Sequence, residues 1–263
     1  MRSKLGCFIF LMITMTSLIF AGTVYYVDAT NGNDLNDGLS PATAWQTILK
    51  VNRSFFSPGD SVLFKRDEIW REQLIIPSSG LSGSPITIAA YGSGNKPIIN
   101  GSDLVIEWTN YNVNAWQSIL ATEPRCVWLD GNFGDKKTSI GELADEYDWY
   151  HDGSNTLYVY STSDPDTAYT SPGIEAAERN NGVYASNKNY LLFQNLHIKQ
   201  TAQEGFYFNV SDNVEINSCT TIETFYAGIR MWKGTNFTID GCIINHAGRV
   251  DNMDYEFGIN FNS

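Results

Sequence analysis

The chain has 263 residues, of which 43% are hydrophobic and 13% aromatic, and this much apolar material excludes a disordered protein. Asp and Glu number 29 against 17 Lys and Arg, for a formal charge of −12. So acidic a chain lacks the basic surface that phosphate binding needs, which argues against nucleic acid as a partner. The 22 Gly with 14 Tyr, 14 Phe and 7 Trp are typical of a turn-rich β protein.

The first residues have the pattern of an export signal. Arg2 and Lys4 precede an apolar run over residues 5–20, and residues 21–22 are the small pair Ala-Gly, as at a cleavage site. The apolar run is short for a membrane span. Residues 1–22 are therefore predicted to be a signal peptide, and the mature chain to be secreted or extracytoplasmic with no membrane attachment.

The next segments follow in chain order. Residues 23–58 are predicted to form a cap with one strand, an Asn/Asp/Gly loop and a short helix from about Ala42 to Asn52. Apolar runs then recur 12 residues apart over residues 59–101. Residues 102–178 break this pattern and include a hairpin over residues 148–160, so an excursion from the repeating part is expected.

Residues 179–263 contain a repeat of 23 residues. Gly182, Gly205 and Gly228 keep this step, and Gly258 follows 30 residues later, so one unit carries seven inserted residues. Each unit holds three short runs of alternating apolar residues, which is the period of β-strands. Strands joined by turns this short can stack in parallel with the equivalent strands of the next unit. Because parallel crossovers are right-handed, the repeat predicts an all-β, right-handed parallel β-helix.

Several motifs near the start resemble secreted bacterial pectate-lyase-like β-helix proteins. They are Tyr25-Tyr26-Val27-Asp28, Gly32-Asn33-Asp34, Asn36-Asp37-Gly38-Leu39-Ser40-Pro41, Ala44-Trp45-Gln46-Thr47-Ile48, Pro58-Gly59-Asp60 and Trp70-Arg71. The resemblance implies the β-helix fold, with residues 59–101 as its first coils, and a polysaccharide as partner. It implies no single activity, since this superfamily includes lyases, hydrolases, epimerases and surface proteins without catalysis.

Alternation along the first strand of each unit places polar and aromatic side chains outside. One outward row is expected to hold Tyr184, Tyr207, Arg230 and Asn260, with Asn209, Trp232 and Asn262 beside it; Val183, Ala185, Phe206, Phe208, Ile229, Met231, Ile259 and Phe261 should face the core. Such a surface suits stacking on sugar rings and hydrogen bonding to their hydroxyls. The predicted substrate-binding residues are Tyr184, Tyr207, Asn209, Trp232 and Asn260. Aromatic residues are also favoured on any β surface, so a purely structural role is the alternative.

The loop over residues 246–257 carries the insertion and gathers charged side chains. The predicted catalytic residues are His246, Arg249 and Arg230, and the predicted metal ligands are Asp251, Asp254 and Glu256, with Asn252 beside them. In β-elimination these oxygens would hold calcium against a uronate carboxylate while a basic group removes the proton. Two of the carboxylates could instead support hydrolysis, and a solvated loop without function is the remaining alternative.

Two structural details complete the expectations. Leu196, Cys219 and Cys242 keep the 23-residue step and should form an inward ladder with both thiols reduced, since three mature cysteines argue against a disulfide framework. His197 is expected to be a surface residue.

Three classes of function remain open. The chain could be a polysaccharide-degrading enzyme, with a calcium-dependent lyase ahead of a glycoside hydrolase. It could instead be a glycan-binding or adhesive β-helix without catalysis, or a structural part of a longer secreted protein. Residues 258–263 look like the opening strand of a further coil without a polar cap, so the sequence is expected to be truncated at this end, with part of the site on the missing coils.

Overall fold

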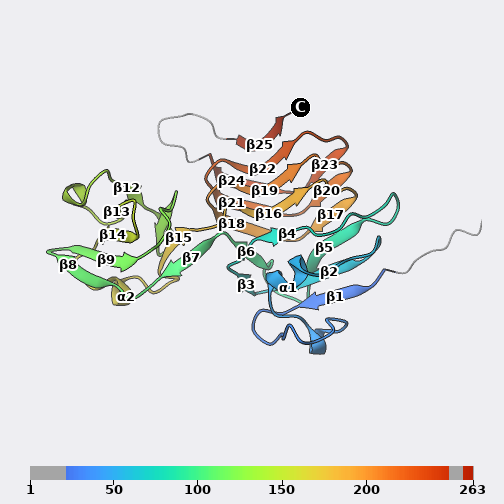
Figure 1. Ribbon diagram of the computed structural model, residues 1–263, viewed down its shortest axis with the longest axis horizontal. Coiled ribbons are helices and arrows are strands. Elements are labelled where there is room, and N and C mark those ends of the chain that lie inside the picture. The colour runs from blue at the N-terminus through green and yellow to red at the C-terminus, as the bar shows by residue number, and fades with distance from the viewer. Residues whose placement is uncertain (1–21, 249–256, 263) are drawn as a thin grey trace, which may run out of the picture.

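The computed structural model describes residues 22–248 and 257–262. It consists of a stack of β-coils with a smaller β lobe on one side, and its helices are short (Figure 1). The predicted all-β, right-handed parallel β-helix is confirmed. No helix in the described ranges is long and apolar enough to cross a membrane.

Three parallel sheets form the faces of the coil. Face A contains β1 (Val24–Val27), β2 (Ser61–Lys65), β5 (Ile86–Tyr91), β17 (Leu191–Gln194), β20 (Val214–Asn217) and β23 (Phe237–Asp240). Face B contains β3 (Ile69–Trp70), β6 (Ile98–Asn100), β18 (His197–Thr201), β21 (Thr220–Thr224) and β24 (Ile243–Ala247). Face C contains β4 (Leu74–Ile75), β16 (Asn181–Ser186), β19 (Glu204–Asn209), β22 (Ala227–Trp232) and β25 (Phe257–Asn262).

The 23-residue step is the register of the coil. On face C, Val183 pairs with Phe206 and Phe206 with Ile229, and all three are fully buried. Leu196 and Cys219 are likewise buried, and Cys242 packs against the same core. The cysteines are free thiols, as expected, and burial raises the pKa of Cys219 to about 12.

The outermost strand departs from the burial that alternation predicts. Ile259 and Phe261 take the inward register positions opposite Ile229 and Met231, but they are 39% and 62% exposed. Their strand, β25, has a neighbour on one side only among the described residues. This edge position explains the exposure of Ile259 and Phe261.

The cap differs from its predicted helix. Residues 41–43 form a 3-10 helix, η1 (Pro41–Thr43), and the α-helix α1 (Ile48–Asn52) has only five residues. Between them the chain is extended and Trp45 forms a bridge with Val27. Asp34 accepts hydrogen bonds from the backbone N–H of Gln46 and from the Thr47 hydroxyl, which holds this stretch out of a helix until Thr47 caps α1.

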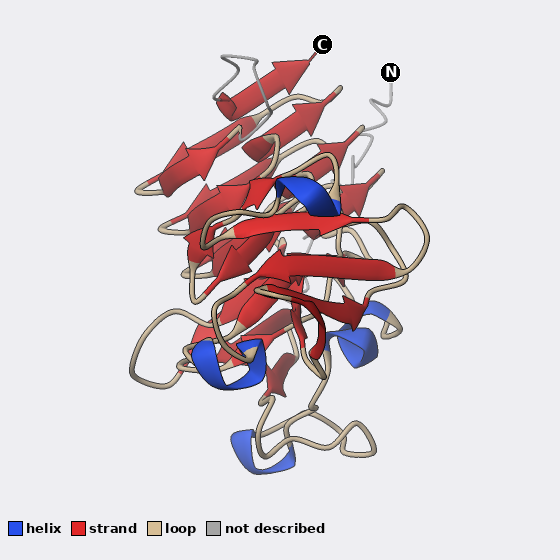
Figure 2. Cartoon of the chain, turned by 90° about the vertical axis from the view of Figure 1, so that its left-hand side faces the viewer, coloured by secondary structure: helices blue, strands red, loops and turns tan. Residues whose placement is uncertain are grey.

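The excursion is a small β domain of its own, inserted between β6 and β16 and seen in front of the coil in Figure 2. Its strands are β7 (Ser102–Val105), β8 (Thr109–Asn112), β9 (Ala115–Ile119), β10 (Val127–Leu129), β11 (Asn132–Phe133), β12 (Asp135–Lys136), β13 (Asp148–His151), β14 (Thr156–Tyr160) and β15 (Ile174–Ala177), with short helices η2 (Ile140–Glu142) and α2 (Pro165–Ala168). The predicted hairpin is confirmed as β13 and β14. The sheets run in the orders β11-β10-β15-β7 and β12-β13-β14-β9-β8.

A buried polar network fastens the excursion to the coil. Glu175, which is 0% exposed, accepts hydrogen bonds from Arg71 Nη2 at 2.7 Å and from Gln200 Nε2 at 2.7 Å. Asn100 Nδ2 donates to the same carboxylate at 3.1 Å. Because a buried carboxylate is costly unless it is paired and hydrogen-bonded, this network holds the base of the excursion in one position.

His197 is more enclosed than a surface residue, so that expectation was wrong. It lies on β18 between Ile98 of β6 and Thr220 of β21, and its Nε2 is buried without a partner among the described residues. Lys96 reaches the Thr220 hydroxyl at 3.0 Å. Burial, with the nearby charges of Lys199 and Lys96, lowers the pKa of His197 to about 4.

His197 should make the stability depend on pH. The unfolded side chain binds a proton near pH 6.5 and the folded one only near pH 4, so stability falls as the pH drops from about 6.5 to 4. The loss should be about 3 kcal/mol. In urea denaturation, the stability of the wild-type chain relative to that of His197→Gln should fall by about 3 kcal/mol across this range, because the variant has no imidazole to protonate. A stability difference that does not change with pH would contradict the lowered pKa of His197.

The close stacking at the start of face C can be tested at Gly205. A Cβ at this position would lie 2.5 Å from the carbonyl oxygen of Gly228 and 3.0 Å from Thr221 Cγ2. Gly205→Ala should therefore destabilise the fold by about 1–3 kcal/mol in equilibrium denaturation. Gly141→Ala is the matched control, since a Cβ there would lie 3.9 Å from Ser139 Oγ, and it should change stability by less than about 0.5 kcal/mol.

Candidate functional site

The outward row on face C is arranged as the alternation predicts. Tyr184 pairs with Tyr207, Tyr207 with Arg230, and Arg230 with Asn260 on successive strands. The rings of Tyr184 and Tyr207 lie 5.6 Å apart, and the Arg230 guanidinium lies 5.5 Å from the rings of both Tyr207 and Trp232. We call Tyr184, Tyr207, Asn209, Arg230, Trp232 and Asn260 the outer strip.

Arg230 is half of an ion pair. Its Nη1 lies 2.8 Å from Oε1 of Glu204, whose side chain is 1% exposed while that of Arg230 is 29% exposed. Glu204 Oε2 and Arg230 Nε are buried with no partner among the described residues. The guanidinium therefore serves to neutralise a buried carboxylate and to lie against the aromatic rings, which makes it a poor candidate for a free base.

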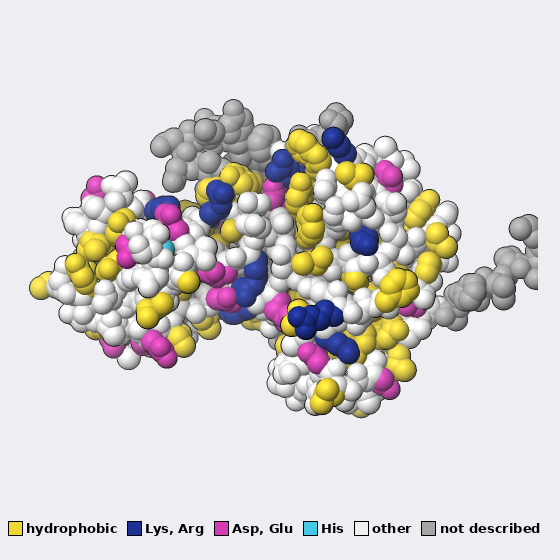
Figure 3. Space-filling view, in the orientation of Figure 1, with side chains coloured by type: hydrophobic (Ala, Val, Ile, Leu, Met, Phe, Trp, Pro, Cys, Tyr) yellow, Lys and Arg dark blue, Asp and Glu magenta, His cyan; other side chains and the backbone are white. Residues whose placement is uncertain are grey.

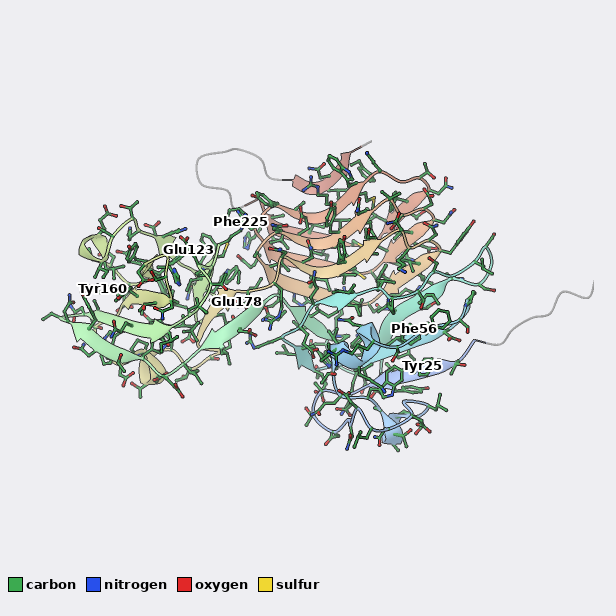
Figure 4. The ribbon with its side chains drawn as sticks, in the orientation of Figure 1. Tyr25, Phe56, Glu123, Tyr160, Glu178 and Phe225 are labelled. Carbon is green, nitrogen blue, oxygen red and sulfur yellow. The ribbon has the colours of Figure 1, made fainter. Side chains whose placement is uncertain are left out.

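Glu178 lies where the chain returns from the excursion to the coil, between β15 and β16 (Figure 4). It is half-buried, and Oε1 is buried without a partner among the described residues. Burial raises the pKa of this carboxyl, and the negative charge of Asp103 adds to the effect. Glu178 is thus a carboxyl group biased towards its protonated form.

A column of polar side chains follows the corner between faces B and C. Gln200, Glu223 and His246 occupy the same position in successive coils, each with a positive φ, of 55°, 55° and 49°. His246 Nδ1 lies 2.6 Å from Glu223 Oε1, and Trp128 Nε1 of the excursion donates to Glu223 Oε2 at 3.0 Å. The Glu223 side chain is 15% exposed and that of His246 54%. A carboxylate that orients an accessible imidazole is an arrangement suited to proton transfer.

An apolar cluster joins the excursion to the coil. It contains Trp128, whose Nε1 bonds to Glu223, together with Ala177, the residue before Glu178, and Phe225, two residues after Glu223. Arg125 of the excursion lies 5.0 Å from the Phe225 ring, and Figure 4 shows Phe225 and Glu178 on the side of the coil that faces the excursion. Figure 3 shows charged side chains of both signs along this junction. We call it the junction site.

The excursion adds charged groups and a small hollow to the junction site. Glu123 Oε1 lies 2.8 Å from Lys136 Nζ, and this hydrogen bond lowers the pKa of Glu123. Arg125, Lys136, Trp149 and Phe225 are among the residues that line a cavity of about 120 Å³. The junction therefore combines charged side chains of both signs with a small hollow.

Four of the predicted residues lie outside the described ranges. They are Arg249, Asp251, Asp254 and Glu256, so the calcium site stays a prediction. Within residues 22–248 and 257–262, no group of three or more His, Cys, Asp or Glu side chains is arranged to hold a metal ion.

Sequence reasoning missed Glu178, Glu204 and Glu223. A signal for Glu223 was available, because Gln200, Glu223 and His246 keep the 23-residue step. No comparable signal marks Glu178, whose environment depends on the insertion of the excursion.

Comparison with known proteins agrees with the fold. A family model described as right handed beta helix region matches residues 152–263. Its first residues fall in the excursion, and the strands β16–β25 within this range belong to the coil. A solved structure of XylC in complex with xylose superposes with a TM-score of 0.71 at 15% identity, over 90% of this chain and 56% of that one. The chain is a right-handed β-helix protein.

Two curated relatives match shorter stretches. A lacto-N-biosidase of Bifidobacterium longum subsp. longum is 40% identical over 85 residues, which is 30% of this chain and 5% of that protein. An alpha-1,3-galactosidase A of Akkermansia muciniphila is 32% identical over 65 residues, or 25% and 11%. The chain thus corresponds to a small part of the length of either relative.

The Arg230–Glu204 pair can be tested by a double-mutant cycle. Arg230→Met leaves a buried carboxylate unpaired and should cost about 3 kcal/mol of stability, whereas Arg230→Met combined with Glu204→Gln should recover at least about 1 kcal/mol. The exposed pair Lys136–Glu123, with side chains 39% and 47% exposed, is the control; Lys136→Met should cost less than about 1 kcal/mol. Additive effects of the two changes at Arg230 and Glu204 would show that the pair is not coupled.

Proposed function

We propose that the chain belongs to a secreted protein that hydrolyses glycosidic bonds, with sugar units bound along the outer strip and cleavage at the junction site. The observation that carries the proposal is the presence of two carboxyl groups with different surroundings beside the apolar contact between excursion and coil. Glu178 has a raised pKa, and Glu223 is bonded to both His246 and Trp128. Most glycoside hydrolysis uses two carboxyl groups, one as general acid and the other as base or nucleophile.

The roles follow from these environments. Glu178, biased towards its protonated form, would donate a proton to the leaving oxygen as general acid. Glu223 would be the second carboxylate, since its side chain is more accessible than that of Glu204, at 15% against 1%. His246 would hold Glu223 in place or relay a proton to it. Arg230 and Glu204 would support the outer strip.

The outer strip supplies the binding surface. Tyr and Trp rings stack on the apolar faces of sugars, and amide side chains bond to hydroxyls. The names of both curated relatives denote glycosidases, and XylC was crystallised with a sugar. These likenesses support a carbohydrate ligand for this chain.

Charge favours hydrolysis of a neutral glycan over elimination from an acidic one. Residues 102–178, the excursion, hold 14 Asp and Glu against 3 Lys and Arg, a formal charge of −11 out of the −12 of the whole chain. A protein surface with this much negative charge repels a polyanion unless a bound cation neutralises part of the charge. Calcium-dependent elimination from a uronate glycan, through Asp251, Asp254 and Glu256, is therefore our second candidate.

Activity assays on a panel of neutral oligosaccharides, aryl glycosides and uronate polymers should separate these functions. We expect new reducing ends from a neutral substrate, unaffected by chelator. Glu178→Gln and Glu223→Gln should each lower kcat by about 100-fold or more, and Glu178→Gln should also remove the basic limb that its raised pKa imposes on the pH profile. Trp232→Ala should mainly raise KM and leave kcat almost unchanged.

The matched control is Glu215→Gln, an exposed carboxylate on face A, which should leave kcat unchanged. Unsaturated products that disappear with chelator would instead support the lyase. Glycan binding by the outer strip without turnover would support a non-catalytic module and contradict hydrolysis.

A further inference from the structure

The formal charge of the molecule is divided unevenly between its two bodies. The excursion carries −11 and the rest of the chain, with 14 Lys and Arg against 15 Asp and Glu, carries −1. The three basic residues of the excursion are already engaged: Arg125 with the ring of Phe225, Lys136 with Glu123, and Lys137 with Asp135 and Asp148. None of the basic side chains of the excursion is therefore left to balance its remaining carboxylates.

The excursion also carries a groove of about 620 Å³. Its lining includes the apolar side chains Leu104, Ile106 and Ile119, which are 42%, 61% and 80% exposed. Val105 lies at its base, 6% exposed. Exposed apolar side chains gathered in one groove, on a surface otherwise rich in charge, are typical of an interaction site. In Figure 3 the excursion shows hydrophobic and acidic side chains side by side.

Carboxylates lie at the rim of this groove, and no described lining residue is basic. Glu107 is itself a lining residue and adopts a φ of 62°. Asp166 accepts a hydrogen bond from the backbone N–H of Trp108, the residue after Glu107, and Asp152 accepts one from that of Thr156, another lining residue. An occupant would thus meet apolar walls with negative charge at the edges.

The lining of the groove includes residues of two edge strands, Leu104 and Val105 of β7 and Thr109 of β8. In the described residues β7 is the edge strand of one excursion sheet and β8 that of the other, and all four residues of β8 are exposed. Edge strands offer unpaired backbone N–H and C=O groups that an extended segment can bond.

We propose that this groove docks a basic, extended polypeptide segment whose apolar and cationic side chains alternate. Apolar side chains would enter between Leu104 and Ile119, while the cationic ones would meet the carboxylates at the rim. A second copy of the chain fits less well, because its excursion is equally acidic and its coil carries no excess of positive charge. The surface is separate from the outer strip and the junction site, and the proposal does not rest on the hydrolytic function.

The test is fluorescence anisotropy with three labelled twelve-residue peptides, in which Val alternates with Lys, Val with Glu, and Ser with Lys. The Lys/Val peptide should bind the full chain. The other two peptides should bind at least about tenfold more weakly, because the Glu/Val peptide has no cationic side chains and the Lys/Ser peptide has no apolar ones. Binding should weaken as salt rises, since charge at an exposed rim is screened.

Variants locate the site. Ile119→Ser should weaken binding of the Lys/Val peptide by about fivefold or more, because an apolar contact is lost. Glu107→Gln should weaken it by a smaller factor. Leu35→Ser, at a 94% exposed apolar residue of the cap, is the matched control and should change nothing. If the Lys/Val and Lys/Ser peptides bind equally well, or if Ile119→Ser leaves binding unchanged, then the interaction depends on surface charge alone and the proposal is wrong. Self-association of the chain that Ile119→Ser abolishes would also overturn it.

Discussion

The stacking of each coil on the next at a constant 23-residue step is the constraint on which the rest of the structure depends. Parallel strands lie about 4.8 Å apart, so residues that are distant in sequence become neighbours in the same orientation. Inside the coil this register builds the column Val183, Phe206 and Ile229. Outside it lines up Tyr207 with Arg230. A single geometric rule therefore creates both the core and the outer strip.

The corner between faces B and C gives this regular cylinder a chemically distinct edge. Gln200, Glu223 and His246 each take a left-handed backbone conformation there, which costs energy for residues other than glycine. The side chains gain strong partners in return: Gln200 bonds to Glu175, and Glu223 to Trp128. Because the excursion is inserted at the same corner, it meets polar side chains instead of a smooth β surface.

The fold was predictable from the sequence because it depends mainly on the 23-residue repeat, which the sequence shows directly. The predictions that failed concern segments whose structure depends on contacts that do not recur along the chain. The helix expected from Ala42 begins late because Asp34 holds Gln46 and Thr47 in an extended stretch. His197 is enclosed with the charged side chain of Lys96 nearby.

The candidate site was predictable only where it follows the repeat. The positions of Tyr184, Tyr207 and Arg230 come directly from alternation, whereas the partner of Arg230 does not. Glu204 is the first residue of β19, and it lies 26 residues before Arg230, which is not a multiple of the repeat. The bond between Trp128 and Glu223 joins residues 95 positions apart, across an insertion whose fold bears no relation to the coil. Sequence spacing cannot reveal such a contact, since nothing in the repeat encodes where the excursion docks.

The uneven distribution of charge between excursion and coil has a structural reason, because the coil stacks equivalent side chains on one another and the excursion does not. In the coil, every side chain stacks on its equivalent, so a charge repeated from coil to coil would lie about 4.8 Å from a like charge; the outer strip instead sets Arg230 beside aromatic and amide side chains. The excursion has no such repetition, and its carboxylates can cap turns and strand ends separately, as Asp152 does at the β13–β14 turn and Asp130 does for Ser171 and Gly173. Acidic residues are thus tolerated in the excursion and disfavoured on the coil. The electrostatic contrast at the junction, which bears on any ligand that approaches it, is therefore a consequence of joining a stacked repeat to an irregular domain.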